Sequence, residues 1–205
     1  MPKRVDPQER REHLAAALMR VAAAQGLESV SLRHVAAEAG VTAGMVQHYF
    51  PSKDAMMQFA MDTASARFEQ RITGVVESLG EQPTPRQLVG AVLGTLLPSN
   101  APDAVEDGRV ALAFMAYATT RPPARADLER NTAGLRDFVR DQLELAVAQG
   151  DAATSLDPQT AAATLVALTD GLGVQVLSSN LPAAVAAAVL EAQLDLTFST
   201  SPRRP

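Results

Sequence analysis

The chain has 205 residues, enough for one large domain or for a small domain joined to a larger one. Its 47% hydrophobic content is ordinary for a globular protein, while few aromatic residues (4%) and abundant alanine favour helices over sheets. The absence of cysteine excludes a disulfide scaffold and thiolate catalysis, and the net charge of −5 argues against a protein that coats nucleic acid.

The start of the chain and its most apolar stretch bear on localisation. The segment MPKRVDPQERREH has no apolar core region, so a signal peptide is not predicted. Asp170 interrupts the most apolar window, 160–190, which argues against a membrane helix. The charge balance is slightly positive over residues 1–60 and negative afterwards, which permits local contact with DNA. We therefore expect a cytoplasmic protein with no membrane partner.

The first helix is predicted to start after Asp6 and to end at Gly26. Asp6 is a suitable N-cap, Pro7 fits the first helical position, and Glu9 is placed to complete a capping box. Apolar residues then recur at helical spacing until the glycine, which favours a helix end.

Two short helices are predicted between residues 31 and 49. Ser31 can cap the first and Gly40 can end it, while Thr42 can cap the second, which runs to about Tyr49. Their connection, Ala39-Gly40-Val41-Thr42, has the length and turn chemistry of a helix-turn-helix.

The remaining chain is predicted to form six longer helices. The fourth starts at Ser52 and runs to about Leu79. Later capping and turn signals predict helices over 85–97, 103–120, 124–149, 158–178 and 180–198, the last opened by Asn180. No alternating strand-length segment and no internal repeat occur. The sequence therefore predicts an all-α fold of nine helices.

The helix that begins at Thr42 has two distinct sides. Val46 and Phe50 point back toward the preceding helix, which leaves a polar and small-residue side formed by Ala43, Gly44, Gln47 and His48. Small residues let a helix N-terminus approach DNA closely, Gln47 can pair with an adenine edge, and His48 can reach a phosphate or a base. Thr42 and the helix-end N–H groups suit a phosphate. Spacing alone leaves open an ordinary helical hairpin with a solvated polar face.

The run GLESVSLRHVAAEAGVTAGMVQHYFPSKDA, residues 26–55, resembles the N-terminal domain of TetR-family transcriptional regulators. The resemblance covers about residues 6–60. It departs from many members at Gln47, where they carry Tyr, and at Tyr49, where they carry His, so base preference cannot be transferred. The matching positions are Gly26, Ser31, Ala36, Ala39-Gly40-Val41-Thr42, Gly44, Phe50 and Lys53.

This resemblance implies a set of DNA contacts. Ser31 and Arg33 would contact phosphate, while Tyr49 and Lys53 would hold the DNA backbone. Residues in or beside the major groove would be Thr42, Ala43, Gly44, Gln47 and His48. Lys3 and Arg4 are candidates for a flexible arm that reaches DNA. The implied organisation is a DNA-binding domain at 1–52, a ligand-binding and dimerisation domain at 53–198, and a disordered tail at 199–205.

TetR-like proteins are also two-fold dimers, in which the last two helices form a four-helix bundle with those of the partner. The sequence agrees independently, because 160–196 is apolar nearly all round and such helices need burial on more than one side. A monomer whose core takes all these sides is the alternative. The two apolar stripes are Leu165, Leu168, Leu172 and Val176, and Val185, Val189, Ala192 and Leu196.

The resemblance further implies a small-molecule cavity under the fourth helix, and the chain from about Pro85 onward resembles the regulatory domain of BetI-like members. Asp170, alone in an apolar helix, could bind a polar ligand group, cap a neighbouring helix or serve the dimer seam. Candidate ligand contacts are Phe59, Thr63, Leu93, Leu97, Phe114, Tyr117, Asn131, Phe138, Asp170 and Gln175.

The function expected from the resemblance is a repressor that binds a palindromic operator as a homodimer and is released by a ligand through a population shift. No cofactor or metal is expected, since the three histidines lie in the small domain without metal-ligand spacing. The alternatives are a ligand-independent regulator or activator, a helical enzyme and a protein-binding adaptor.

Overall fold

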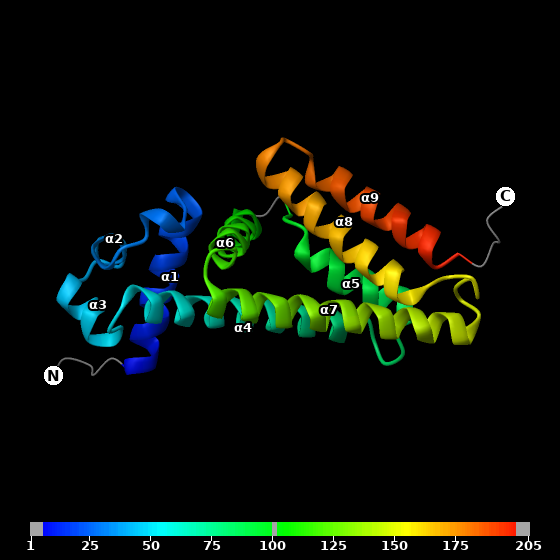
Figure 1. Cartoon of the computed structure of the whole chain (residues 1–205), viewed down its shortest axis with the longest axis horizontal. Coiled ribbons are helices and arrows are strands. Elements are labelled where there is room, and N and C mark those ends of the chain that lie inside the picture. The colour runs from blue at the N-terminus through cyan, green and yellow to red at the C-terminus, as the bar shows by residue number, and fades with distance from the viewer. Residues whose placement is uncertain (1–5, 100–101, 200–205) are drawn as a thin grey trace. The chain divides into compact units, whose positions relative to one another are not determined.

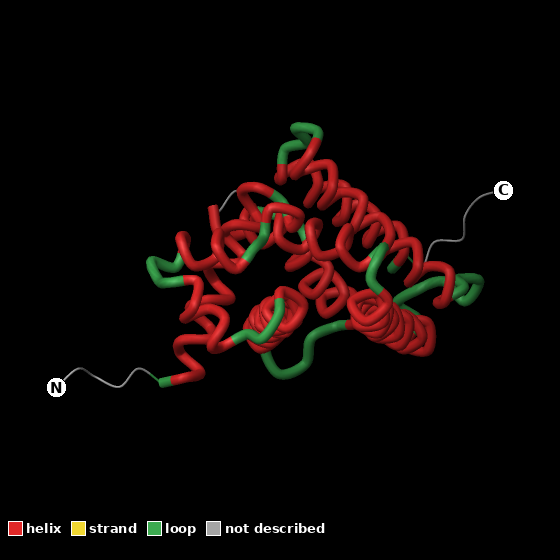
Figure 2. Tube along the Cα trace, turned by 60° about the vertical axis from the view of Figure 1, so that its left-hand side comes forward, coloured by secondary structure: helices red, strands yellow, loops and turns green. Residues whose placement is uncertain are grey.

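The computed structural model describes residues 6–99 and 102–199. Within these residues it contains nine α-helices, one short 3-10 turn and no strand, so the predicted all-α fold is confirmed (Figure 2). The predicted arm at Lys3 and Arg4 and the predicted tail from 200 onward lie outside the described residues. The elements are α1 (Pro7–Gln25), η1 (Leu27–Ser29), α2 (Leu32–Glu38), α3 (Ala43–Tyr49), α4 (Lys53–Ser78), α5 (Pro85–Leu96), α6 (Pro102–Ala118), α7 (Pro122–Gln149), α8 (Pro158–Ser178) and α9 (Ala183–Thr197) (Figure 1).

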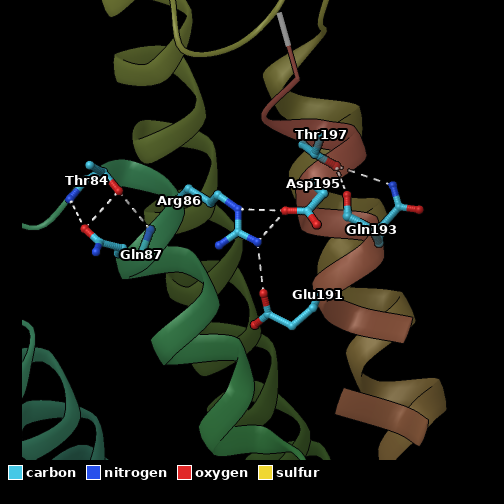
Figure 3. Close-up of polar contacts among 7 residues, drawn as sticks. All are labelled: Thr84, Arg86, Gln87, Glu191, Gln193, Asp195 and Thr197. Atoms are coloured by element: carbon cyan, nitrogen blue, oxygen red, sulfur yellow. Dashed lines mark hydrogen bonds and ion pairs between the residues drawn. The ribbon is translucent and has the colours of Figure 1, made fainter. Parts of the chain in front are cut away.

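Side-chain caps explain where several helices start. The Asp6 carboxylate accepts the Gln8 N–H at 2.9 Å before α1, and the Ser52 hydroxyl accepts the Ala55 N–H at 3.1 Å before α4. At α5, the Thr84 hydroxyl accepts the Gln87 N–H at 3.3 Å, and the Gln87 side chain accepts the Thr84 N–H at 2.9 Å (Figure 3). The predicted capping box of α5 is therefore confirmed.

Two predicted helix starts were wrong. Helix α7 begins at Pro122 rather than near Ala124. Proline is tolerated in the first turn of a helix because the N–H that it lacks would have no hydrogen-bond partner within the helix there. Helix α9 begins at Ala183 rather than at Asn180, which adopts the left-handed conformation (φ 63°) in the connecting loop. Asparagine tolerates this conformation better than most residues, so Asn180 marks a turn and not a helix start.

The chain forms two compact units. The N-terminal unit comprises the residues up to Glu69 together with Arg109–Arg125, and the C-terminal unit comprises Gln70–Gly108 and the residues from Ala126 onward. Helices α4, α6 and α7 each contribute residues to both units. The predicted boundaries at residues 52 and 198 divide the chain by expected function and not by compactness, and they stay predictions.

In the N-terminal unit, α1 is the central core element. Its Leu14 and Leu18 are fully buried and pack with Val35 of α2, Val46 of α3 and Met56 of α4. Each such side chain contributes about 1.5–3 kcal/mol of hydrophobic stabilisation. This core fixes α2 and α3 on the rest of the unit.

In the C-terminal unit, α5, α7, α8 and α9 enclose a second core that includes Leu93, Leu143, Leu165 and Leu190. Among the described residues, α8 is the one helix whose length and composition would allow it to cross a membrane. Core helices of soluble proteins share these properties, and Leu165 shows that one side of α8 lies in this core.

An ionic cluster joins the start of α5 to α9 in the same unit. The Arg86 guanidinium donates to Glu191 at 2.9 Å and to Asp195 at 3.1 Å (Figure 3). The hydrogen bond to Asp195 is the main cause that raises the pKa of Arg86 above its ordinary value. Both carboxylates stay largely exposed, so the cluster lies at the surface of the unit.

Candidate nucleic-acid interface

Helices α2 and α3 form a hairpin with one buried side. Val35 is fully buried in α2, Val46 is fully buried in α3, and Phe50 directly after α3 is 3% exposed. Gly40, in the turn, has a φ of 66°, a conformation that side chains with a Cβ rarely adopt. The predicted inward side of α3 is therefore confirmed.

The opposite side of α3 faces solvent. Thr42, Ala43, Gly44, Gln47 and His48 are all exposed. They present a hydroxyl, an amide, an imidazole and two positions with little or no side chain at the start of a helix. These groups can donate to and accept from base edges and phosphates, and the small residues allow close approach.

Gly44 is informative because the fold itself does not require a glycine there. A Cβ at this position would meet only the Thr42 hydroxyl, at the ordinary van der Waals distance of 3.9 Å. A glycine within a helix costs up to about 1 kcal/mol relative to alanine. Other helix glycines, such as Gly74, have the same open space, so it is the place of Gly44 on the exposed polar side of α3 that fits close approach by a partner.

The hydroxyl groups of Ser31 and Thr42 each accept a capping hydrogen bond and keep their own hydrogen free to donate. Each hydroxyl accepts a backbone N–H of the helix it caps, from His34 and from Met45, both at 3.2 Å. A hydroxyl that accepts in this way can still donate its own hydrogen to a phosphate oxygen. Arg33, beside the first of these caps, is exposed.

Tyr49 and Lys53, predicted to hold the DNA backbone, already make contacts within the unit. Both are half-buried, and the Tyr49 ring packs edge-on against the His48 ring with centroids 5.2 Å apart. The Lys53 ammonium donates to the Leu27 carbonyl at 3.4 Å, which leaves two of its three hydrogens for another acceptor.

Sequence reasoning did not identify two side chains of α1 that hold α2. The His13 Nε2 lies 3.1 Å from the carbonyl oxygen of Ala39, the C-cap of α2, and the Arg20 guanidinium pairs with Glu38 at 2.6 Å. No local pattern signals such contacts, because the partners are 26 and 18 residues apart in sequence. They tie the helix-turn-helix to the most buried helix of the unit.

Four ligand candidates lie in the N-terminal unit. Phe114 is buried at 9% exposure, and Phe59 packs against the same core. The Thr63 hydroxyl donates to the Phe59 carbonyl at 2.8 Å. The Tyr117 hydroxyl donates to the Asp54 carboxylate at 3.3 Å, next to the start of α4. These contacts stabilise the unit, and the ligand role of the four residues stays a prediction.

The other six candidates lie in the C-terminal unit. Leu93 is fully buried in the core, with Leu97 and Phe138 packed against it. Asn131, Asp170 and Gln175 are exposed. Partial burial nevertheless raises the pKa of the Asp170 carboxyl above its ordinary value. Within the described residues, no group of three or more His, Asp or Glu side chains is placed to hold a metal ion.

Comparison with known proteins accounts for both parts of the chain. Residues 14–58 match the family model described as bacterial regulatory proteins, tetR family, and residues 85–199 match the model described as BetI-type transcriptional repressor, C-terminal. The HTH-type transcriptional regulator PksA of Bacillus subtilis (strain 168) is 30% identical over 179 residues, which is 86% of this chain and 83% of PksA.

Solved structures show the same relationship. A transcriptional regulator from Rhodococcus sp. Rha1 is 30% identical, with a TM-score of 0.80 over 95% of this chain and 99% of that one. The multidrug binding protein EbrR, complexed with malachite green, is 25% identical, with a TM-score of 0.64 over 90% of this chain and 98% of that one. The protein therefore belongs to the TetR family of bacterial regulators, and it is a DNA-binding transcriptional regulator whose C-terminal part is of the BetI type.

Proposed function

We propose that the protein is a cytoplasmic, homodimeric repressor that binds a palindromic operator through α3 and is released from it by a small molecule. The observation that carries the proposal is the exposed side of α3, where polar side chains and two small residues lie together at the start of the second helix of a helix-turn-helix. A helical enzyme or a protein-binding adaptor would not need this arrangement at a helix-turn-helix.

At the operator, the functions divide between reading bases and holding phosphates. Gln47 and His48 contact base edges in the major groove, with Ala43 and Gly44 allowing the approach of the helix. The phosphate contacts are made by Ser31, Arg33, Thr42, Tyr49 and Lys53. These positions together form the functional part of the DNA-binding domain, residues 1–52.

Dimerisation uses α8 and α9 of residues 53–198. Val185, Val189 and Leu196 form an apolar stripe on α9 that is 45%, 39% and 69% exposed, respectively, in the single chain. On α8, Val174 is 39% exposed, whereas the other predicted stripe is turned into the core at Leu165 and Leu172. A second copy of the chain covers the exposed stripe, and it also supplies the second recognition helix that a palindrome requires.

A ligand acts by binding the DNA-competent and DNA-incompetent dimer shapes with different affinity. The proposal that such a ligand exists is supported by EbrR, a similar protein whose structure holds malachite green. The ten candidate contact residues, Asp170 among them, are the positions to vary once a ligand is identified.

The experiment that tests the function selects fragments of the source genome with the purified protein and then titrates the best fragment at several salt concentrations. A shared palindrome bound by a dimer, with affinity that falls steeply as salt rises, is the expected result. The genes beside it then narrow the class of ligand. A folded dimer that enriches no sequence contradicts the proposal.

A further inference from the structure

One side chain of α1 reaches the place where α3 ends and α4 begins. The central carbon of the Arg11 guanidinium lies 5.8 Å from the ring centroid of Phe50 and 5.8 Å from that of Phe59. Its Nη2 donates to the carbonyl oxygen of Tyr49 at 3.5 Å. The two rings also contact each other, with centroids 5.5 Å apart and planes inclined by 51°.

These partners belong to two functional elements. Tyr49 is the last residue of α3, Phe50 is its C-cap, and Phe59 lies two turns into α4. Carbonyl groups at a helix C-terminus carry partial negative charge, which favours a guanidinium beside Tyr49. A planar guanidinium can donate hydrogen bonds while its face or edge contacts aromatic rings, which an ammonium group does less well.

The surroundings of Arg11 are open rather than close-packed. A cleft of about 330 Å³ adjoins the residue, between the α3–α4 junction and one side of α4 that carries Ala55, Gln58, Phe59 and Asp62. Arg11 itself is exposed. Because dense packing does not fill this region, the contacts of Arg11 are well placed to limit how the end of α3 tilts against α4.

We propose that Arg11 is a positioning residue for operator recognition, which fixes the end of the recognition helix α3 against α4 through Tyr49, Phe50 and Phe59. This inference rests on the proposed function, because it assumes that α3 reads DNA. Arg11 acts through α3 and does not touch DNA itself. Its removal lowers the preference for operator over other DNA while leaving the count of phosphate contacts unchanged.

The test uses the full-length protein and the operator selected from the genome. Arg11→Met removes the charge and the hydrogen-bond donors but keeps much of the side-chain length. Arg11→Lys keeps the charge but loses the planar guanidinium group. Arg10→Met is the matched control on α1, since within the described residues no hydrogen bond, ion pair or ring contact joins the Arg10 side chain to another group. Affinity for operator and for unrelated DNA is measured over a range of salt, together with the melting temperature.

We expect Arg11→Met to bind the operator about tenfold more weakly, with unrelated DNA bound as by the wild type and with the same salt slope. Arg11→Lys should recover part of the operator preference, because it keeps a cation beside the rings. Arg10→Met should keep the wild-type operator preference. If Arg11→Met has a lower melting temperature than the wild type, the comparison of Arg11→Lys with Arg10→Met still tests the contacts of the guanidinium.

Two results would overturn the inference alone: an Arg11→Met variant with wild-type operator preference, or a salt slope reduced by about 0.9 in Arg11→Met and restored in Arg11→Lys. The second result would assign Arg11 to a direct phosphate contact. A wild-type protein that prefers no sequence would overturn the proposed function and this inference with it.

Discussion

Helices α3 and α9 each leave one side uncovered, and the two uncovered sides have opposite chemistry. That of α3 carries Gln47 and His48 beside a glycine, whereas that of α9 carries Val185, Val189 and Leu196. Protein–DNA interfaces are polar and wet, and small polar groups suit them. Exposed apolar stripes are usual where another protein surface binds. This contrast supports the proposal that the chain presents two interfaces, each matched to a different kind of partner.

The other sides of α9 sharpen this contrast. Leu190 and Leu194 are buried in the core, and Glu191 and Asp195 pair with Arg86. The core and the ionic cluster therefore fix α9 on its own unit. The Val185–Val189–Leu196 stripe, by contrast, has no need to be apolar unless something covers it.

The largest effect is expected from a charge in this stripe. Leu196→Glu should weaken dimerisation by at least about 100-fold, because the interface would have to bury an unpaired carboxylate. Operator binding should be lost with it, and sedimentation velocity at low micromolar concentration measures the change. Ala184→Glu, which places the same charge on an exposed part of α9 outside the stripe, is the control and should remain dimeric. A Leu196→Glu protein that stays dimeric would show that this stripe is not the interface.

A methyl group added on the polar side of α3 should change the stability of the protein and its affinity for operator in opposite directions. Gly44→Ala is expected to raise the free energy of unfolding by about 0.5–1 kcal/mol while weakening operator binding at least about tenfold. The first effect follows from helix propensity and the second from a Cβ where DNA approaches. Chemical denaturation and DNA titration measure the two quantities.

Gly74→Ala in α4 is the matched control for Gly44→Ala. A Cβ at Gly74 would meet nothing within 4 Å, so a side chain fits there as it does at Gly44. It should raise stability by a similar amount and leave operator binding unchanged. Unchanged operator binding by Gly44→Ala as well would show that DNA does not approach α3 at this point.

A moderate effect is expected where α9 is held to α5. Arg86→Met should lower the free energy of unfolding by about 0.5–1 kcal/mol, the range of a partly exposed ion pair, and the loss should shrink at high salt. Arg136→Met, an exposed position of α7, is the control. If Arg86→Met matches this control at low salt, the cluster contributes no net stability.

The smallest effect is expected at Asp170. Since partial burial raises the pKa of this carboxyl in the folded chain, its ionised form disfavours folding. Asp170→Asn should therefore raise the melting temperature by about 1–3 °C at neutral pH. The difference should shrink as the pH falls through the raised pKa of the folded chain and be nearly lost at about pH 3, where the carboxyl is largely protonated in both states. A difference that persists at pH 3 would assign the effect to another cause.

The sequence was a good guide where structure depends on neighbours along the chain. Ser31, Thr42 and Thr84 cap the helices that they were predicted to cap, because a cap needs only a hydroxyl two or three residues before the N–H it accepts. The inward side of α3 followed from helical spacing alone. At Asn180 the same local reasoning failed, because a residue suited to capping is also suited to a left-handed turn.

Contacts between distant segments could not be predicted in this way. Arg11 and the Tyr49 carbonyl are 38 residues apart, and arginine in an exposed helical position usually extends into solvent. Only the packing of α1 against the α3–α4 junction brings them together. For the same reason the ten ligand candidates could be named from resemblance but not arranged around a cavity.

The continuity of α4 has a mechanical consequence. A helix of 26 residues is about 39 Å long, because each residue adds about 1.5 Å. If such a rod pivots near one end by about 5°, its other end moves by about 3 Å, close to the rise of one base pair along B-DNA. Hydrogen bonds to base edges tolerate only a few tenths of an ångström. Under the proposed mechanism, a ligand would need to produce only a slight tilt of this helix to bring a recognition helix out of register with its operator.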